Sequence, residues 1–278
     1  MLMFDGVHVD VHGLTDVGRV RESNQDQFLI AALHKVVEIH GTSIPATYRD
    51  RFHSGARALL LLVADGVGGR QSGDVASSLT LDAITDYVTN SMRCFYKLDE
   101  QIPLDLLAEL AATVEQSHAS VLERAGERPE RAGMATTLTM AHVLWPRVYV
   151  VHIGDSRCYH IRGRDLVQVT KDQTLVQDLV DMGALTEEDA KLSPLGNVLS
   201  QAIGHADEIN PVITKIEVEP GDSLLLCTDG LTTHVSDQEI SAYLGTAASA
   251  TEACERLVSA AIDGGGRDNV TVVVGRFS

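Results

Sequence analysis

The chain has 278 residues, of which 44% are hydrophobic, so it can bury a large core and lies near the upper size of one domain. Its formal net charge of −17 argues against a nucleic-acid backbone or an anionic membrane surface as a partner, because both would repel it. Basic protein surfaces and metal cations are the ligands that this charge favours.

The N-terminus and the cysteines both indicate a cytoplasmic protein. Residues 1–5 lack a basic region and a cleavable apolar stretch, so no export signal is visible. The cysteines are widely spaced and form no CxxC pair, which favours reduced thiols over disulfides or zinc. They are Cys94, Cys158, Cys227 and Cys254.

The first predicted element is a strand in which valines at positions 7, 9 and 11 alternate with polar residues. The polar face carries His8, Asp10 and His12. Two histidines and an aspartate at strand spacing have the chemistry of a zinc site, and a solvated strand face explains them equally well.

A polar turn follows and leads into an apolar strand at residues 28–32. Asp26 stands at the start of this strand. Arg21, just upstream, carries a guanidinium group that could bind a phosphate, although by itself it also fits a surface arginine. Residues 34–57 then form a polar and locally basic insert.

An uninterrupted apolar run at residues 59–63 predicts a strand covered on both faces, and it ends on Ala64 and Asp65. A carboxylate at the rim of a core is costly unless a cation or hydrogen bonds compensate, so we expect a metal at Asp65. The following glycines allow close approach of the backbone and leave the Gly66 carbonyl free as a second oxygen ligand. If this strand pairs antiparallel with the preceding one, Asp26 and Asp65 meet.

Two nucleotide-binding motifs compete for this strand and glycine pattern. Residues 68–73 have P-loop spacing, but Asp74 stands where that motif needs a lysine. The dinucleotide fingerprint needs a glycine where Gln71 stands. The residues therefore disfavour both.

The remaining elements follow from hydrophobic periodicity and turn residues. Helices are predicted at 75–88, 104–125, 174–191 with a break at Gly183, 236–243 and 248–262. Strands are predicted at 136–144, 147–153, 156–161, 165–170, 212–218, 223–227 and 270–274.

Four aspartates stand at strand ends or turns, each beside a glycine or after a glycine-rich turn: Asp65, Asp155, Asp229 and Asp268. With Asp26 they indicate a convergent cluster of hard oxygen ligands, which suits Mg²⁺ or Mn²⁺ rather than zinc or copper. Paired divalent ions activate a water and neutralise charge on a phosphoryl group, so the pattern predicts metal-assisted phosphoester hydrolysis.

Five short motifs appear in order along the chain: Arg21-x-x-Asn24-Gln25-Asp26, Asp65-Gly66-Val67-Gly68-Gly69, Gly154-Asp155-Ser156-Arg157, Thr228-Asp229-Gly230 and Arg267-Asp268-Asn269. Each is short, but jointly they are specific, and the chain resembles the PP2C (PPM) family of Ser/Thr protein phosphatases, bacterial type. The resemblance implies an α+β fold, a four-layer α-β-β-α sandwich of two antiparallel sheets flanked by helices, in a single domain over residues 1–278.

The resemblance also implies the activity. It would be a protein-serine/threonine phosphatase that hydrolyses phosphoserine and phosphothreonine by direct attack of a hydroxide bridging two Mg²⁺ or Mn²⁺ ions. Such an enzyme would act on phosphorylated proteins, oppose a cognate Ser/Thr kinase in bacterial signalling, and be a monomer.

By motif, Asp65 would bridge the two ions, with the Gly66 carbonyl on the second ion and Asp229 and Asp268 on the first. Asp155 would join Asp229 at a third, weaker site. The resemblance further implies that Asp26 holds metal-bound water, that Arg21 binds the substrate phosphate and that Asn269 supports the site. Residues 172–204 would form a mobile flap.

Three departures from the family pattern stand out. Gln25 replaces a common glutamate and removes one negative charge beside the second metal. Val67 and Arg70 occupy positions where animal and bacterial members, respectively, often have a histidine, and the insert at 34–57 exceeds the usual connection. No departure removes a metal-binding aspartate, so we expect an active enzyme.

Two other functions remain open from the sequence. A catalytically silent binding module would keep the fold and lose metal ligands, and the intact aspartates count against it. A phosphatase for a small metabolite could use the same metals.

Overall fold

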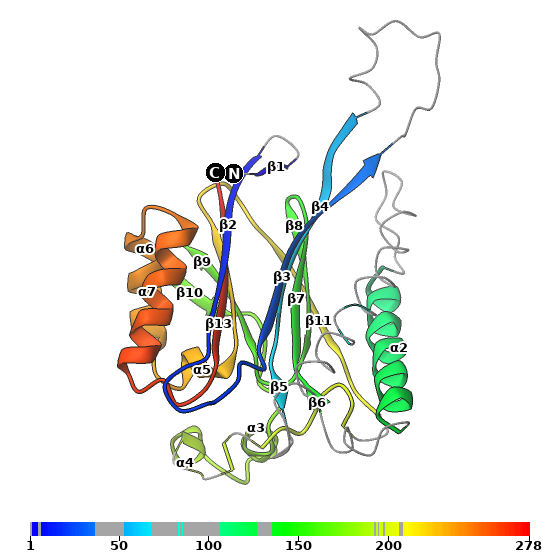
Figure 1. Cartoon of the computed structure of the whole chain (residues 1–278), viewed down its shortest axis with the longest axis vertical. Helices are drawn as coiled ribbons and strands as arrows, with labels where there is room; N and C mark the ends of the chain where they lie inside the picture. Colours follow the sequence, from blue (N-terminus) through cyan, green and yellow to red (C-terminus); the bar gives the residue numbers. More distant parts are fainter. Residues whose placement is uncertain are drawn as a thin grey trace, which may run out of the picture.

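The computed structural model describes residues 2–4, 7–36, 53–67, 83, 85, 106–126, 135–191, 193, 195–196, 198–205 and 208–278. Two β-sheets pack face to face, and helices cover both outer surfaces (Figure 1). The predicted helix at 75–88 lies outside the described residues except for Ala83 and Thr85, which are helical.

The first sheet has six antiparallel strands in the order β1-β2-β13-β12-β9-β10. Their bounds are β1 Leu2–Phe4, β2 Val7–Asp16, β9 Arg157–Arg162, β10 Asp165–Gln168, β12 Ser223–Cys227 and β13 Val270–Phe277.

The second sheet has five antiparallel strands in the order β11-β8-β7-β4-β3. Its strands are β3 Gln27–Val36, β4 His53–Ala64, β7 Leu138–Leu144, β8 Arg147–Ile153 and β11 Val212–Glu217. A two-stranded pair, β5 (Gly66–Val67) and β6 (Ala135–Thr136), continues β4 and β7 at one end.

The apolar run of β4 explains why the sandwich has cores on both sides of this sheet. Leu59, Leu61 and Val63 lie in the core between the sheets, whereas Leu60 and Leu62 lie in the core under helix α2 (Leu106–Gly126). Side chains alternate between the two faces of a strand, so a strand covered on both faces is apolar at every position. Full burial of each leucine contributes about 2 kcal/mol.

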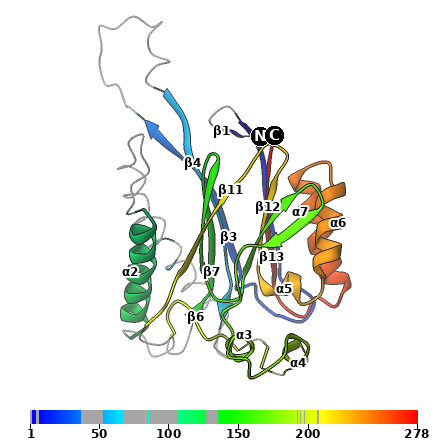
Figure 2. The same cartoon turned by 180° about the vertical axis from the view of Figure 1, so that it is seen from behind.

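The first sheet is covered by helices α5 (Asp229–Thr232), α6 (Asp237–Thr246) and α7 (Ala250–Asp263), whose apolar residues form one cluster with β9, β12 and β13. Figure 2 shows these helices and α2 on opposite outer faces. The predicted α-β-β-α sandwich is therefore confirmed.

Helices α3 (Leu175–Asp181) and α4 (Glu187–Lys191) lie at the end of the sandwich that carries β5 and β6 (Figure 1). Gly183, with φ of +71°, separates them, as the sequence predicted for a break at that position. None of the helices in the described part of the chain combines the length and hydrophobicity needed to span a bilayer.

On the strand face with two histidines, the structure gives Asp10 a hydrogen-bond partner. Asp10 Oδ2 accepts a 2.7 Å hydrogen bond from the backbone N–H of Ala250, the first residue of α7, while His8 is exposed. Within the described residues, no three Asp, Glu, His or Cys side chains are grouped closely enough to enclose a metal by themselves. A carboxylate at a helix N-terminus is stabilising, and this accounts for Asp10.

The prediction of reduced thiols is confirmed for the three described cysteines. Cys158, Cys227 and Cys254 are free and buried. Cys158 lies in the core between the sheets and Cys227 in the core under α5–α7, so the first sheet separates these two thiols. Cys94 lies outside the described residues.

Both ends of the predicted insert at 34–57 belong to strands of the second sheet. Strand β3 continues to Val36 and β4 begins at His53, and these two residues pair, although the register shifts near His34. Antiparallel pairing satisfies backbone groups whatever the side chains are, so a polar sequence can extend a hairpin. Residues 37–52 lie outside the described part.

Candidate active site

The site lies at the end of the sandwich where β3 begins and β4 ends. Gln27 pairs with Ala64, so Asp26 and Asp65 stand on adjacent strands just beyond the ladder, and the Gly66 N–H donates to the Gln25 carbonyl at 3.3 Å. The antiparallel pairing predicted for these two strands is confirmed.

Three more aspartates arrive from the other sheet and from the turn between the sheets. Asp229 follows β12, Asp268 precedes β13, and Asp155 lies in the turn from β8 to β9. The carboxyl groups of Asp26, Asp155, Asp229 and Asp268 all lie close enough to Asp65 to act on its charge. The structure thus brings together the five predicted residues Asp26, Asp65, Asp155, Asp229 and Asp268, which we call the acidic cluster.

The carboxyl groups of the acidic cluster lie close together and are largely buried, so ionising all of them costs free energy. Burial and then the charges of Asp26, Asp229, Asp155 and Asp268 hold the pKa of Asp65 well above its ordinary value. Burial, with repulsion from neighbouring carboxylates, raises the pKa of Asp26 to about 7, of Asp155 to about 8 and of Asp229 to about 6.

The cluster has the chemistry of a site for Mg²⁺ or Mn²⁺. Asp26 Oδ1 and Asp229 Oδ1 are buried and have no hydrogen-bond partner among the described residues. Such oxygens are costly to bury unless a cation binds them. Carboxylate oxygens are the ligands that Mg²⁺ and Mn²⁺ prefer.

Arg21 belongs to the same site. Its Nη2 donates a 2.6 Å hydrogen bond to Asp268 Oδ2, and its side chain remains 54% exposed. This bond, followed by the charges of Asp65 and Asp229, raises the pKa of Arg21 despite partial burial. The guanidinium therefore partly neutralises the acidic cluster.

The Asp26 carboxylate is held by hydroxyl groups that the sequence did not single out. Thr228 Oγ1 donates to Asp26 Oδ2 at 2.8 Å and accepts a 3.0 Å bond from the Thr271 N–H. Asn24 Oδ1 accepts from the Asp26 N–H at 3.1 Å. The threonine at 228 was visible in its motif, but its contact with Asp26 spans 202 positions of sequence.

Asn269 connects the loop before β3 to the loop before β13. Its Oδ1 accepts from the Gln25 N–H at 2.9 Å, and its Nδ2 donates to the carbonyls of Val17 and Ser23 at 2.9 and 3.0 Å. Its own N–H donates to Asp268 Oδ1 at 2.9 Å. Because Asn269 is buried, these bonds fix Arg21 and Asp268 on a common frame.

Glycines beside the aspartates allow segments of different motifs to touch. A Cβ on Gly230 would lie 1.9 Å from the Asn269 carbonyl oxygen, and one on Gly154 would lie 2.6 Å from Thr137 Cγ2. Gly154 also has φ of +107°, which side chains disfavour. The Asp-Gly pairs are therefore needed for packing of the motifs against one another.

Residues 171–173, where the chain enters the predicted flap, attach to the turn that carries Asp155. Arg157 pairs with Asp172 through Nε and Nη2 at 2.9 and 2.7 Å. Gln173 N–H donates to the Gly154 carbonyl at 2.7 Å, and Gln173 Oε1 accepts from the Gly154 N–H at 2.8 Å. This turn is thus held on both sides.

Val67, in β5, pairs with Ala135 of β6, so an aliphatic side chain stands two residues after Asp65. Arg70 lies outside the described residues. The sequence from Asp65 to Asp74 contains no histidine, so this loop supplies no imidazole acid.

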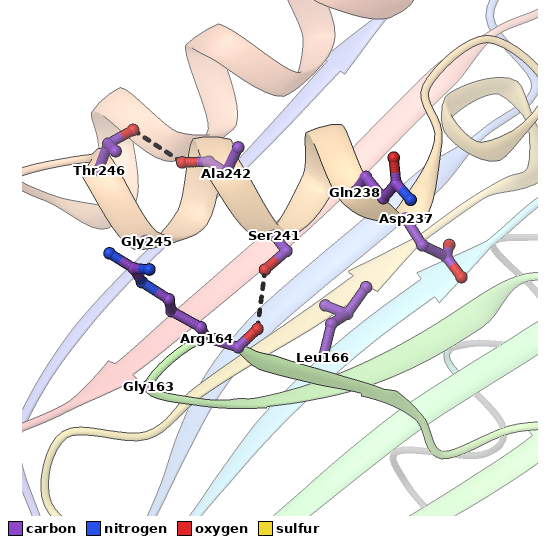
Figure 3. A pocket seen from close by; sticks show the side chains of 9 residues that line it. All are labelled: Gly163, Arg164, Leu166, Asp237, Gln238, Ser241, Ala242, Gly245 and Thr246. Atoms are coloured by element: carbon purple, nitrogen blue, oxygen red, sulfur yellow. Dashed lines mark hydrogen bonds between the residues drawn. The ribbon is translucent and has the colours of Figure 1, made fainter.

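A surface pocket between α6 and the β9–β10 turn lies apart from the acidic cluster. It is lined by residues that include Arg164, Leu166, Asp237 and Ser241, and Ser241 Oγ donates to the Arg164 carbonyl at 3.1 Å (Figure 3). Strand β9 runs away from the site from Arg157 to Arg162, so this turn is at the far end of the sheet.

An α-β-β-α sandwich with a carboxylate cluster at one end defines the structural class of this protein. Comparison with known proteins defines its family. Residues 46–263 match the family model described as Protein phosphatase 2C. The chain belongs to the protein phosphatase 2C family, as its motifs indicated.

Two curated relatives illustrate the similarity. The chain is 41% identical over 233 residues to the serine/threonine protein phosphatase PstP of Mycobacterium tuberculosis, covering 83% of this chain and 42% of that protein. It is 32% identical over 267 residues to the protein phosphatase PhpP of Streptococcus pneumoniae, covering 96% of each. The chain thus spans less than half of PstP and nearly all of PhpP.

Solved structures agree on the fold. The crystal structure of the M. tuberculosis phosphatase PstP matches with a TM-score of 0.73 and 36% identity, over 97% of this chain and 98% of that one. The catalytic domain of PstP in complex with two manganese ions matches with a TM-score of 0.72 and 34% identity, over 98% of each chain.

Proposed function

We propose that this chain is a metal-dependent protein-serine/threonine phosphatase that hydrolyses phosphoserine and phosphothreonine without a phosphoenzyme. The observation that carries the proposal is the acidic cluster, with two buried carboxylate oxygens that lack partners among the described residues. The manganese-bound PstP structure and the named protein phosphatases among the relatives support the choice of metal and substrate class.

We assign ligands from the motifs that the chain shares with the protein phosphatase 2C family. Asp65 would hold both ions, the Gly66 carbonyl the second, and Asp229 and Asp268 the first. Asp155, together with Asp229, would hold a third ion. Two bound divalent ions supply an activated water and neutralise charge on the phosphoryl group.

The protein's own groups then bind and orient the reactants. Arg21 can turn its exposed guanidinium from Asp268 to a substrate phosphate, which offers the same bidentate geometry as a carboxylate. Asp26, held through Oδ2 by Thr228, keeps Oδ1 available to accept a hydrogen bond from water. The hydroxyls and Asn269 keep these groups in fixed positions, which is the structural basis of preorganisation.

The wider biological setting is also part of the proposal. We place the protein in the cytoplasm as a monomer that acts on phosphorylated proteins and opposes a Ser/Thr kinase. We propose a single domain over residues 1–278, with 34–57 as an insert and 172–204 as a flap. A core shared by both sheets supports the single domain.

The test uses Asp65→Asn and Asp229→Asn, each of which removes one charge from the proposed metal pair. Hydrolysis of p-nitrophenyl phosphate in Mn²⁺ should fall by about 10²-fold or more, because metal ions supply several kcal/mol of transition-state stabilisation. Asp165→Asn, at the far end of β10, is the matched control and should retain activity.

Circular dichroism must show that both variants are folded. A folded variant with near wild-type Mn²⁺-dependent activity would refute the metal assignment. Wild-type protein without any Mn²⁺-dependent turnover would instead favour a silent binding module. Faster turnover of phosphometabolites than of phosphopeptides would replace the protein substrate by a small one.

A further inference from the structure

His152 is a fully buried polar residue that packing does not explain. It lies on β8 opposite Thr139 of β7, and Thr139 lies opposite Val63 of β4. By strand alternation these positions face the core between the sheets, in the row of side chains just inside Asp65. An apolar residue would fill this position at lower cost, so the imidazole needs a reason.

Both ring nitrogens of His152 have partners. Nε2 lies 3.0 Å from the Lys171 carbonyl oxygen, and Nδ1 lies 2.9 Å from Thr139 Oγ1. A carbonyl can only accept, so Nε2 carries the hydrogen. Burial lowers the pKa of His152 to about 4, so the ring is neutral at pH 7 and Nδ1 accepts from the Thr139 hydroxyl.

One side of the ring connects to the backbone of Asp65. The single hydroxyl hydrogen of Thr139 is shared between His152 Nδ1 and the Ser156 carbonyl at 3.0 Å, and Ser156 Oγ lies 2.7 Å from Thr137 Oγ1. Thr137 Oγ1 accepts from the Asp65 N–H at 2.9 Å, and the Thr137 N–H donates to the Asp65 carbonyl at 2.9 Å. Every member of this path except Asp65 is buried.

The other side of the ring connects to the start of the predicted flap. Lys171 immediately precedes Asp172 and Gln173, which are bound to Arg157 and Gly154. The Gln173 carbonyl accepts a hydrogen bond from the Ser200 N–H at 2.9 Å, so the segments that enter and leave the flap are joined at its base. Gly154, Arg157 and the Thr136–Ile203 pair also connect the flap to this region, and His152 adds a buried side-chain connection from Lys171 to the path ending at Asp65.

We propose that His152 is a positioning residue, which fixes the base of the flap relative to the backbone of Asp65. It touches no reacting atom in the proposed site and acts through its bond to Lys171, while Thr139 orients the ring. The effect on turnover rests on the proposed phosphatase function, whereas the effect on the flap base does not.

The two bonds can be separated by substitution. Glutamine at position 152 can place an amide N–H where Nε2 stood, and asparagine can place one where Nδ1 stood. His152→Gln should keep the Lys171 bond and behave almost as wild type. His152→Asn should lose it, so the amides of Gln173 and Ser200 should exchange with deuterium about 10-fold faster or more.

The turnover of the variants should follow the deuterium exchange: His152→Gln should be close to wild type, and His152→Asn should be impaired. For p-nitrophenyl phosphate, His152→Asn should lower kcat by about 10-fold or more, as loss of a group that orients metal ligands commonly does. KM should change less than about 2-fold, because Arg21 and its frame are untouched. His142→Gln is the control: His142 is equally buried in β7, but it faces the α2 side and lies four residues from the cluster end of the strand.

If His152→Asn does not fold, His152→Leu provides the same test, since it loses the Lys171 bond and an apolar side chain suits the buried position. The proposal is overturned if His152→Asn exchanges and turns over like wild type, if His152→Gln is as impaired as His152→Asn, or if His142→Gln gives the same pattern. Deuterium exchange is measured without substrate, so an inactive wild type would refute the function while leaving this test intact.

Discussion

Binding of Mg²⁺ should release protons from the acidic cluster, in a number that falls as pH rises. Bound divalent ions favour the ionised form of these carboxyls, whereas the pKa values of Asp155, Asp26 and Asp229 are raised to about 8, 7 and 6, and that of Asp65 is raised well above its ordinary value. Summing the protonated fractions of Asp155, Asp26 and Asp229 gives about 2.4 protons released at pH 6 and about 1.5 at pH 7.

Isothermal titration calorimetry in pairs of buffers with different ionisation enthalpies measures this number directly. Asp155→Asn should reduce the release at pH 7 by about one proton, since this carboxyl is mostly protonated before metal binds. Asp165→Asn, at the far end of β10, should leave it unchanged. Release that is absent at pH 6, or constant from pH 6 to 8, would refute the assignment of these carboxyls as metal ligands.

The same pKa values determine the stability of the metal-free protein. A carboxyl whose pKa is raised by folding binds more protons in the folded state, so stability falls as pH rises from about 4 to about 8. Raising the pKa of Asp229 from 3.8 to about 6 corresponds to about 3 kcal/mol lost across that window. In EDTA the melting temperature should therefore be lower at pH 8 than at pH 5, and Mg²⁺ should restore it most at pH 8.

Three further predictions concern the surroundings of the cluster. Arg21→Ala should raise KM with a smaller fall in kcat, because the guanidinium binds phosphate in both the ground state and the transition state. The affinity for Mg²⁺ should not fall, since Arg21 competes with the metal for Asp268. An unchanged KM would make Arg21 a surface residue. Shortening the insert at 34–57 should spare p-nitrophenyl phosphate hydrolysis, because β3 leaves the site at Asp26 and continues to Val36, and collapse of activity in a folded variant would refute this placement. Val67→His should raise kcat more on a phosphoserine peptide than on p-nitrophenyl phosphate, because only the serine alkoxide needs a proton on leaving, and equal effects would contradict this account.

The sequence predicted the strands that carry the site because each is an apolar run that ends on Asp-Gly or begins after Asp. Residues 59–63 and 223–227 show this clearly, and both lie within strands of the structure. The run at 270–274 also lies within a strand, but β13 continues to Phe277. Its final residues pair with β2, and this pairing could not be inferred from either segment alone.

The contacts that hold the site could not be predicted in the same way. Thr228 reaches Asp26, and Arg21 reaches Asp268, across more than 200 positions of sequence. Such bonds depend on how the sheets stack, which periodicity does not report. Helix α5 was missed for a related reason, since its four residues start at Asp229 itself and are too few to show a helical pattern.

The origin of the five aspartates has a mechanical consequence. Asp26 and Asp65 belong to one sheet, Asp229 and Asp268 to the other, and Asp155 lies in the turn that crosses between them. If Asp65 and Asp229 hold an ion as proposed, that ion would connect the two sheets at an edge where the like charges otherwise repel one another. A force that pulls the two sheets apart from this edge would then have to break the metal–carboxylate bonds before the apolar side chains between the sheets separate.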